Sequence, residues 1–243
     1  MDIKISGSGQ LAAGEYDAVK ISGSAMINGY TRCKSFHCSG STHSVEDLEC
    51  ENEMKVSGSC KFDKNVKSES ISISGAIKSG GDITAIGEIS TSGGLKCNGS
   101  VKAGKISISG AAKIKGDMEA ETIKISGVID CGGLMNAEDV DIRFDKSGMR
   151  IGSIGGSRIS IYSRNTDKGK VKLPLFSSLI RSKTAVTVEN SIEGDSIAIE
   201  GVVTPRVSGR IVAIGDGCEI DLVQYSEQIE ISPNAKVGKT EKI

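Results

Sequence analysis

The sequence predicts an all-β protein folded as a parallel β-helix, and three observations lead to that prediction. A tripeptide that ends in Ser-Gly recurs between residues 5 and 127, and its glycines lie about 17 residues apart. Apolar residues stand at fixed distances before and after each of these glycines. Trp is absent and Pro occurs three times, while Gly occurs 31 times. A repeat of this length is typical of a solenoid, in which each repeat is one coil that packs on its neighbours.

Apolar residues occur in pairs spaced by two, which is the period of a β-strand with both side chains on one face. Each coil has three such pairs with Gly-marked corners between them, which predicts three short strands and a triangular section. The Ser-Gly turns end at Gly7, Gly23, Gly40, Gly58, Gly75, Gly93, Gly110 and Gly127. We expect glycine at these corners because a corner often needs a positive φ angle, which other residues adopt at a cost.

The pattern continues with less regularity to residues 229–231, which gives 13 or 14 coils. Right-handed coiling is favoured, because parallel crossover connections are right-handed by default. The left-handed alternative is built from hexapeptides and so needs about 18 residues per coil, whereas the mean period here is nearer 17.

The chain divides into three parts. Residues 1–145 are predicted to form a regular rod, and residues 186–243 form further coils. Between them, residues 146–185 are expected to form an irregular coil and a protruding loop. This part contains an apolar segment with Leu173, Leu175, Phe176 and Ile180. That segment is either an irregular coil packed on the rod or a docking loop for a membrane or a partner, and the sequence leaves both open.

The coils resemble those of the bactofilins, polymer-forming cytoskeletal proteins of bacteria. The resemblance rests on Ile-x-Ile-Ser-Gly coils, such as residues 106–110, with a second Gly six residues after the first. It covers residues 3 to about 145 well and the remainder less well. It implies a non-enzymatic scaffold that polymerises without nucleotide and recruits other proteins. The chain departs from the family in being about twice as long as the compact bactofilin core, with essentially no disordered tails.

Composition and termini indicate a cytoplasmic protein. The formal net charge is −1, whereas a nucleic-acid-binding protein needs a basic surface. No apolar run approaches the length of a membrane span, and the start resembles neither a signal peptide nor the apolar membrane tether of some bactofilins. We therefore expect membrane contact to be peripheral only, at the inner face of the membrane. The seven Cys, an odd number without a secretory signal, are expected to be reduced thiols.

The residues Cys33, His37, Cys38 and His43 are the best candidates for a metal site, because two Cys and two His can bind zinc. The stronger interpretation is structural. Cys33 and Cys38 fall on inward-facing positions of the coil, and a buried free Cys behaves as a small hydrophobe. We therefore expect no metal and no cofactor.

An enzyme is the alternative reading of the chain. Sugar-processing β-helix enzymes need clustered acids on one long face, and the acidic residues here are scattered. A hexapeptide-type acyltransferase needs a catalytic His, and His37 and His43 lie within one early stretch. We predict that the protein is not an enzyme, with such an acyltransferase as the alternative.

Self-assembly is the last expectation. A β-helix exposes unpaired backbone groups and a section of its core at each end, and strand edges of this kind can add strands to one another. The predicted assembly residues are Ile3, Ile5 and Leu11 at one end and Ile229, Ile231 and Val237 at the other. The predicted partner is a second copy of the chain, and the proteins that such a polymer recruits are not identified by the sequence.

Overall fold

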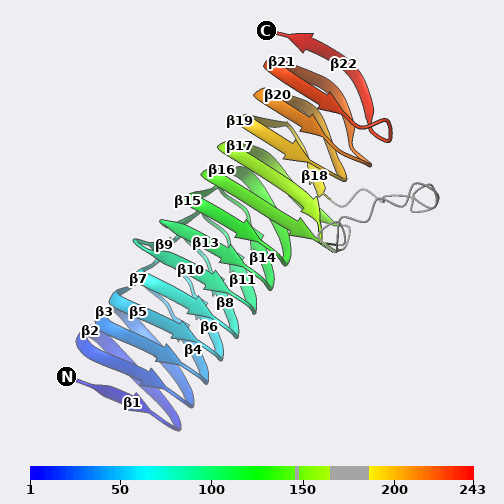
Figure 1. The fold of residues 1–243 in the computed structure, drawn as a ribbon. Helices are drawn as coiled ribbons and strands as arrows, with labels where there is room; N and C mark the ends of the chain where they lie inside the picture. The colour runs from blue at the N-terminus through cyan, green and yellow to red at the C-terminus, as the bar shows by residue number, and fades with distance from the viewer. Residues whose placement is uncertain (146–147, 165–185) are drawn as a thin grey trace.

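The computed structural model, shown in Figure 1, describes residues 1–145, 148–164 and 186–243. In these ranges the chain is a rod of stacked coils made of β-strands, with the two termini at opposite ends. The strand pairs are parallel throughout, as between β1 and β2 and between β21 and β22. The predicted all-β parallel β-helix is therefore confirmed. The described residues include no helix that could cross a membrane.

The strands follow the chain from one end of the rod to the other. The first coils contain β1 (Ile3–Ile5), β2 (Ser8–Ile21), β3 (Ser24–Cys38), β4 (Ser41–Ser44), β5 (Leu48–Val56), β6 (Ser59–Phe62) and β7 (Val66–Ile73). The middle coils contain β8 (Ala76–Ser79), β9 (Ile83–Ala85), β10 (Glu88–Thr91), β11 (Gly94–Cys97), β12 (Val101–Lys102), β13 (Lys105–Ile108), β14 (Ala111–Ile114) and β15 (Met118–Ile125). The last coils contain β16 (Val128–Phe144), β17 (Met149–Ser163), β18 (Val186–Val188), β19 (Ser191–Ile199), β20 (Val202–Ile214), β21 (Glu219–Ile231) and β22 (Lys236–Lys242).

Each regular coil has three faces. In one coil, β10 forms the first face, β11 follows the Ser-Gly turn on the second, and β12 lies on the third. Each strand pairs with the strand on the same face of the next coil, namely β13, β14 and β15. Longer strands such as β16 continue around two corners and pair on all three faces. The three short strands per coil predicted from the apolar pairs are thus present.

The apolar columns of the sequence become ladders inside the rod. On the first face one column runs through thirteen coils, and its interior members are at most 1 % exposed. Its members in register are Ile3, Val19, Phe36, Met54, Ile71, Ile89, Ile106, Ile123, Val140, Ile159, Ile197, Val212 and Ile229. The first and last members are only partly buried, because each has a coil on one side alone.

Glycine occupies the Ser-Gly turns for a reason other than the expected one. The turn glycines are absent from the glycines with positive φ, so that part of the interpretation was wrong. A Cβ on Gly110 would lie 2.0 Å from the carbonyl oxygen of Gly93, one coil earlier. The same contact, at 1.8–2.0 Å, recurs at the other turn glycines from Gly23 to Gly127. Coil-to-coil approach therefore excludes a side chain at the turn.

Gly7 is the informative exception among these turns. A Cβ on Gly7 would meet nothing within 4 Å, because the chain supplies no described coil before it. The first Ser-Gly turn therefore has a glycine, as the later turns do, although no described coil lies where it would exclude a side chain.

The boundary of the regular rod lies beyond residue 145. Within the part predicted to be irregular, 146–185, the described residues 148–164 contain β17, which pairs along its length with β16 and then with β19. The third part also continues the rod, since β19, β20 and β21 pair in order. Residues 146–147 and 165–185 lie outside the described residues.

The seven Cys are buried inside this rod and none forms a disulfide. Burial raises the pKa of the thiols of Cys97, Cys131 and Cys218 to about 11. These side chains fill inward positions as small apolar groups, which is the structural role expected from the sequence.

The column assignment can be tested by placing a carboxylate inside and outside one strand. Ile108 of β13 is 1 % exposed, so Ile108→Asp should bury an unpaired carboxylate and lower stability by at least about 3 kcal/mol. Lys105 of the same strand is exposed and pairs with Glu88 at 3.0 Å, so Lys105→Asp should cost less than about 1 kcal/mol. Thermal and denaturant unfolding measure both variants, and equal stabilities would show that the column is misassigned.

The close approach at the turns gives a second prediction. Gly110→Ala should destabilise the rod by about 2 kcal/mol or more, because the new methyl group collides with the backbone of the preceding coil. Gly7→Ala is the matched control and should change stability by less than about 0.5 kcal/mol, since its methyl group has open space. Unfolding curves recorded at low protein concentration compare the two, and a large loss in Gly7→Ala would contradict the steric explanation.

Candidate functional site

The N-terminal end of the rod is an open strand edge. β1 pairs with β2, through Ile3 with Val19 and Ile5 with Ile21, and no described strand pairs with its other edge. Val19 and Ile21 are 0 % and 1 % exposed, whereas Ile3 and Ile5 are only partly buried. The predicted residues Ile3 and Ile5 therefore lie at the open edge. Leu11, also predicted, is 4 % exposed and belongs to the core.

Tyr16 lies at this same end, and the sequence reasoning did not find it. Its hydroxyl donates a hydrogen bond to the carbonyl oxygen of Ala12 at 2.9 Å. Tyr16 is in register with Cys33, at a narrow corner where interior coils carry small residues. Those residues include Cys33, Cys50, Ser68, Ala85, Ala120, Ala137, Gly156, Gly194 and Gly209.

The same corner column has a second tyrosine near its other end, Tyr225, which is in register with Gly209 and with Lys242 of the last strand. Both Tyr16 and Tyr225 are partly buried against the core. An interior coil is confined by neighbours on both sides, so its narrow corner admits only small side chains. Tyr16 has no described coil before it at this corner, and Tyr225 has only the last strand beyond it, so each position admits a large ring, which covers apolar surface. The departure from small residues was the sequence signal that could have revealed both positions.

Asp17 fastens the N-terminal edge to the next coil. Its carboxylate accepts hydrogen bonds at 2.5 Å from Lys34 and from the ammonium group of Met1. The hydrogen bond from Lys34 is the largest of the effects that lower the pKa of Asp17 to about 2, followed by the hydrogen bond from the Met1 ammonium group. Because the side chain is exposed, this cluster fixes geometry more than it adds stability.

At the C-terminal end the last strand is β21 on the first face and β22 on the other two faces, and no described strand pairs with the outer edge of either. On the first face β21 ends with Ile229, partly buried, and Ile231, which is 39 % exposed. On the second and third faces β22 pairs with β21 and presents mainly polar side chains. Val237, the remaining predicted assembly residue, lies in β22 and is partly buried. The apolar part of the open surface at this end is therefore centred on residues 229–231, whereas the open edge of β22 is mainly polar.

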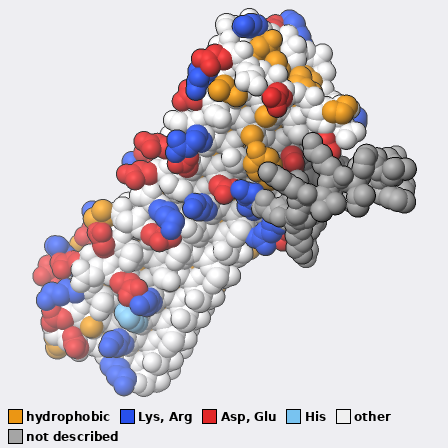
Figure 2. Space-filling view, in the orientation of Figure 1, with side chains coloured by type: hydrophobic (Ala, Val, Ile, Leu, Met, Phe, Trp, Pro, Cys, Tyr) orange, Lys and Arg blue, Asp and Glu red, His pale blue; other side chains and the backbone are white. Residues whose placement is uncertain are grey.

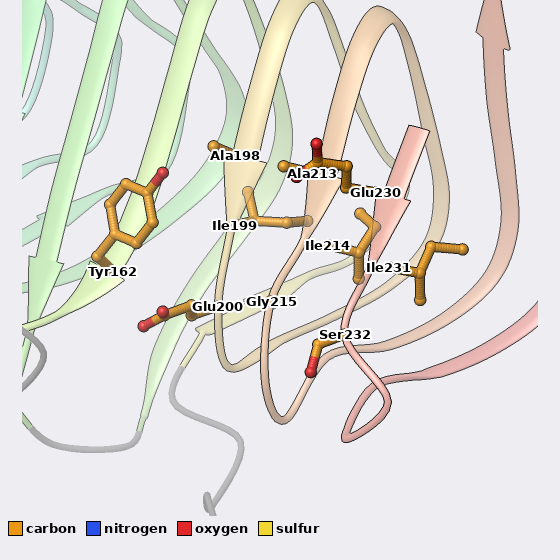
Figure 3. Close-up of a pocket in the computed structure, with 10 residues that line it drawn as sticks. All are labelled: Tyr162, Ala198, Ile199, Glu200, Ala213, Ile214, Gly215, Glu230, Ile231 and Ser232. Atoms are coloured by element: carbon orange, nitrogen blue, oxygen red, sulfur yellow. The ribbon is translucent and has the colours of Figure 1, made fainter. Parts of the chain in front are cut away.

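A shallow groove of about 330 Å³ adjoins this open surface on the first face of the last coils (Figure 3). Ala198 and Ala213 occupy successive outward positions, and their small side chains make the floor. Tyr162 stands at one end of the groove and Ile231 at the other. Loss of solvent around Tyr162, with a smaller effect of the Glu200 carboxylate, raises the pKa of its phenol. In Figure 2 hydrophobic side chains gather over these coils on the visible face.

The candidate zinc residues do not come together. Cys33 and Cys38 are buried in the core, while His37 is in register with Lys20 and Lys55 on the outer side of the first face. His43 lies 2.7 Å from an oxygen of Asp63 and 3.0 Å from the Lys61 ammonium nitrogen. Among the described residues no group of three or more His, Cys, Asp or Glu could hold a metal ion.

The groove in Figure 3 has no His in its lining. The predicted docking residues Leu173, Leu175, Phe176 and Ile180 lie outside the described residues.

Comparison with known proteins gives one distant similarity. No family model and no solved structure matches the chain. Among curated proteins, the chain is 24 % identical over 111 residues to an uncharacterized protein, YhbF, of Bacillus subtilis (strain 168). The matched part is 46 % of this chain, which spans about two fifths of the length of that relative (42 %). The assignment of the fold therefore comes from the structure and not from this comparison. The name of this relative assigns no activity.

Proposed function

We propose that this protein is a non-enzymatic scaffold that assembles through the ends of its rod, in the manner that the resemblance to bacterial bactofilins implies. The observation that carries the proposal is the pair of open edges on the first face, at β1 and at residues 229–231. Each edge presents free backbone donors and acceptors beside partly buried Ile side chains. Strand addition at such an edge satisfies the backbone groups and removes apolar surface from water.

Nucleotide has no part in this assembly. Burial of the two edges supplies the driving force, since apolar burial stabilises a contact by about 25 cal/mol per Å² removed from water.

The location proposed is the cytoplasm, with peripheral contact at the inner face of the membrane. The proteins that the assembly positions are partners still to be found, and pull-down from native cells would identify them.

The charges at the ends favour contact between unlike ends. If the first face continued from one copy to the next in the register of the internal coils, residues 229–231 would lie beside β1. Glu230 would then lie next to Lys4, and opposite charges across neighbouring strands are favourable. Contact between two N-terminal ends would instead bring two copies of Lys4 together. On the third face the same register brings Glu241 near Glu15, and Lys239, at 2.5 Å from Glu241, offsets that like-charged contact. Unlike-end contacts repeat without closing and so produce an open filament.

Gly7 supports the same arrangement. At the later turns glycine is required because the backbone of the preceding coil occupies the place of a Cβ. A second copy stacked on the N-terminal end would provide that preceding coil for Gly7. A methyl group at this position would then obstruct assembly while leaving the single chain undisturbed.

The proposal predicts that a charge at either edge prevents assembly. Ile5→Asp and, separately, Ile231→Asp should abolish or strongly reduce filaments, because the carboxylate would be buried at the contact. Ile86→Asp is the matched control, since Ile86 is 67 % exposed on the side of the rod, and it should assemble as the wild type does. Sedimentation and electron microscopy measure assembly, and circular dichroism verifies the fold. Wild-type protein that stays monomeric at high concentration would overturn the proposal.

The choice of ends is tested by a charge exchange. Lys4→Glu and Glu230→Lys should each weaken assembly in low salt, because each single change creates a like-charged pair at an unlike-end contact. The double variant should recover much of the loss, and Gly7→Ala should assemble poorly despite normal melting. If the double variant is no better than the single ones, the contact joins like ends or uses another surface.

A further inference from the structure

A column of four lysines runs along the second face in the middle of the rod. Lys61, Lys78, Lys96 and Lys113 lie in consecutive coils and are directly in register. All four side chains are exposed. Neighbouring strands in a sheet are about 4.8 Å apart, so the column is a row of positive charges about 14 Å long. We call these four residues the lysine ladder.

The lysine ladder is a longer row of lysines than Lys4 and Lys20, which are also in register on the first face. At many other places opposite charges pair between neighbouring coils, as in Lys102 with Glu119 at 2.8 Å and Lys34 with Asp17 at 2.5 Å. Acidic and basic side chains lie side by side in this way on the face seen in Figure 2. Lys78 and Lys96, the inner members of the ladder, form no ion pair with any described residue. Like charges directly opposite one another destabilise a sheet, so the ladder is unfavourable for the isolated rod.

A groove accompanies the ladder. The outward positions beside Lys78, Lys96 and Lys113 are occupied by Ala76, Gly94 and Ala111, and this column continues with Ser59 beside Lys61 and Val128 beside Asp130. With the lysines they line a shallow groove of about 550 Å³. Val128 is 49 % exposed, and a Cβ on Gly94 would be in ordinary contact with Ala76 at 3.9 Å. The second face thus combines a positive row with a parallel apolar channel.

Carboxylates limit the positive row at one end and along the next corner. At the end Lys113 pairs with Asp130 of the next coil at 2.5 Å, and on the corner side Lys61 pairs with Asp63, two residues further along the chain, at 2.8 Å. Four residues after the lysines, at the next corner, Asp82 and Asp117 accept hydrogen bonds of 2.8 Å from backbone amides of the next coil. A membrane surface or a nucleic acid presents negative charge over a wider area and would meet these carboxylates as well. A short negative stripe fits the ladder better.

We propose that this face binds an α-helix of a partner protein, along the rod, through an acidic stripe with an apolar stripe beside it. Acidic side chains on successive turns of a helix are about 5.4 Å apart, against about 4.8 Å for the lysines. Over the three steps of the ladder the mismatch is about 2 Å, which flexible lysine side chains absorb. On an extended peptide, side chains of one face recur about every 6.7 Å, and the mismatch grows to about 6 Å. The small side chains of the channel let a helix approach closely, as in other helix-in-groove complexes.

This inference names the class of partner that the scaffold recruits and rests on the proposed function for that meaning. The face itself is complete within one chain, so binding does not require assembly. Failure of one proposal therefore leaves the other standing, and the two are measured separately.

The test uses a helical peptide of about 18 residues, and so about 27 Å long, with Glu at positions i, i+4, i+7 and i+11 and apolar residues in the adjacent stripe. Binding to full-length protein is measured by calorimetry or fluorescence anisotropy, in wild type and in the assembly-deficient Ile5→Asp variant. We expect similar affinity in both. We also expect roughly tenfold or greater loss when Gln replaces Glu in the peptide, and steep weakening with salt.

Two protein variants separate charge from shape. Lys78→Glu/Lys96→Glu should weaken binding roughly tenfold or more, while Lys20→Glu/Lys124→Glu makes the same change in net charge on the exposed first face and should leave binding unchanged. Gly94→Leu fills the apolar channel and keeps all four lysines, and it should also weaken binding. Equal binding by the Gln peptide, or equal loss in both double variants, overturns the proposal. So does tighter, ladder-dependent binding of anionic lipid vesicles or duplex DNA than of the peptide.

Discussion

Stacking of one coil directly on the next is the constraint on which every other feature of this protein depends. The backbone hydrogen bonds between coils fix the separation of the strands at about 4.8 Å, and the register then places like residues in columns. Inside the rod the columns are mainly apolar ladders, and in the first-face column that runs from Val19 to Val212 each member is at most 1 % exposed. A single coil has too little core to stand alone, so stability is shared between neighbours as in other solenoids.

The same stacking decides which residues the corners accept. At the Ser-Gly turns the carbonyl oxygen of the preceding coil lies where a Cβ would be, as at Gly110. At the narrow corner, small residues such as Ala137 and Gly156 fit between neighbours, and tyrosine occurs only near the ends, at Tyr16 and Tyr225. At both kinds of corner, the space for a side chain depends on what the adjoining coils leave free.

The periodicity of the sequence predicts some features of this structure and not others. The spacing of apolar pairs predicted the strands, their inward faces and the coil number, because alternation and repeat length are properties of order along the chain. The contacts between coils, however, cannot be derived from the order of residues along the chain alone. The sequence suggested that the Ser-Gly turns, such as the one at Gly110, need a positive φ, whereas contact with the preceding coil is what requires glycine there. It also grouped Val237 with the apolar assembly residues, whereas Val237 lies in the mainly polar strand β22. The lysine ladder was present in the sequence at a spacing of about 17 residues, but only the register showed that four exposed charges form one row.

The two proposals place assembly and recruitment on different parts of one simple rod. The edges at β1 and at residues 229–231 lack the neighbour that each interior coil has, and a second copy supplies it. The inner members of the lysine ladder, Lys78 and Lys96, have their neighbouring coils but form no ion pair with any described residue, and the proposed partner helix would supply the counter-charges. A rod that lengthens by end contacts keeps its second face free, so each added copy brings another ladder of four lysines. Assembly would therefore array partner sites along the filament, and clustered sites raise the effective concentration of whatever binds them.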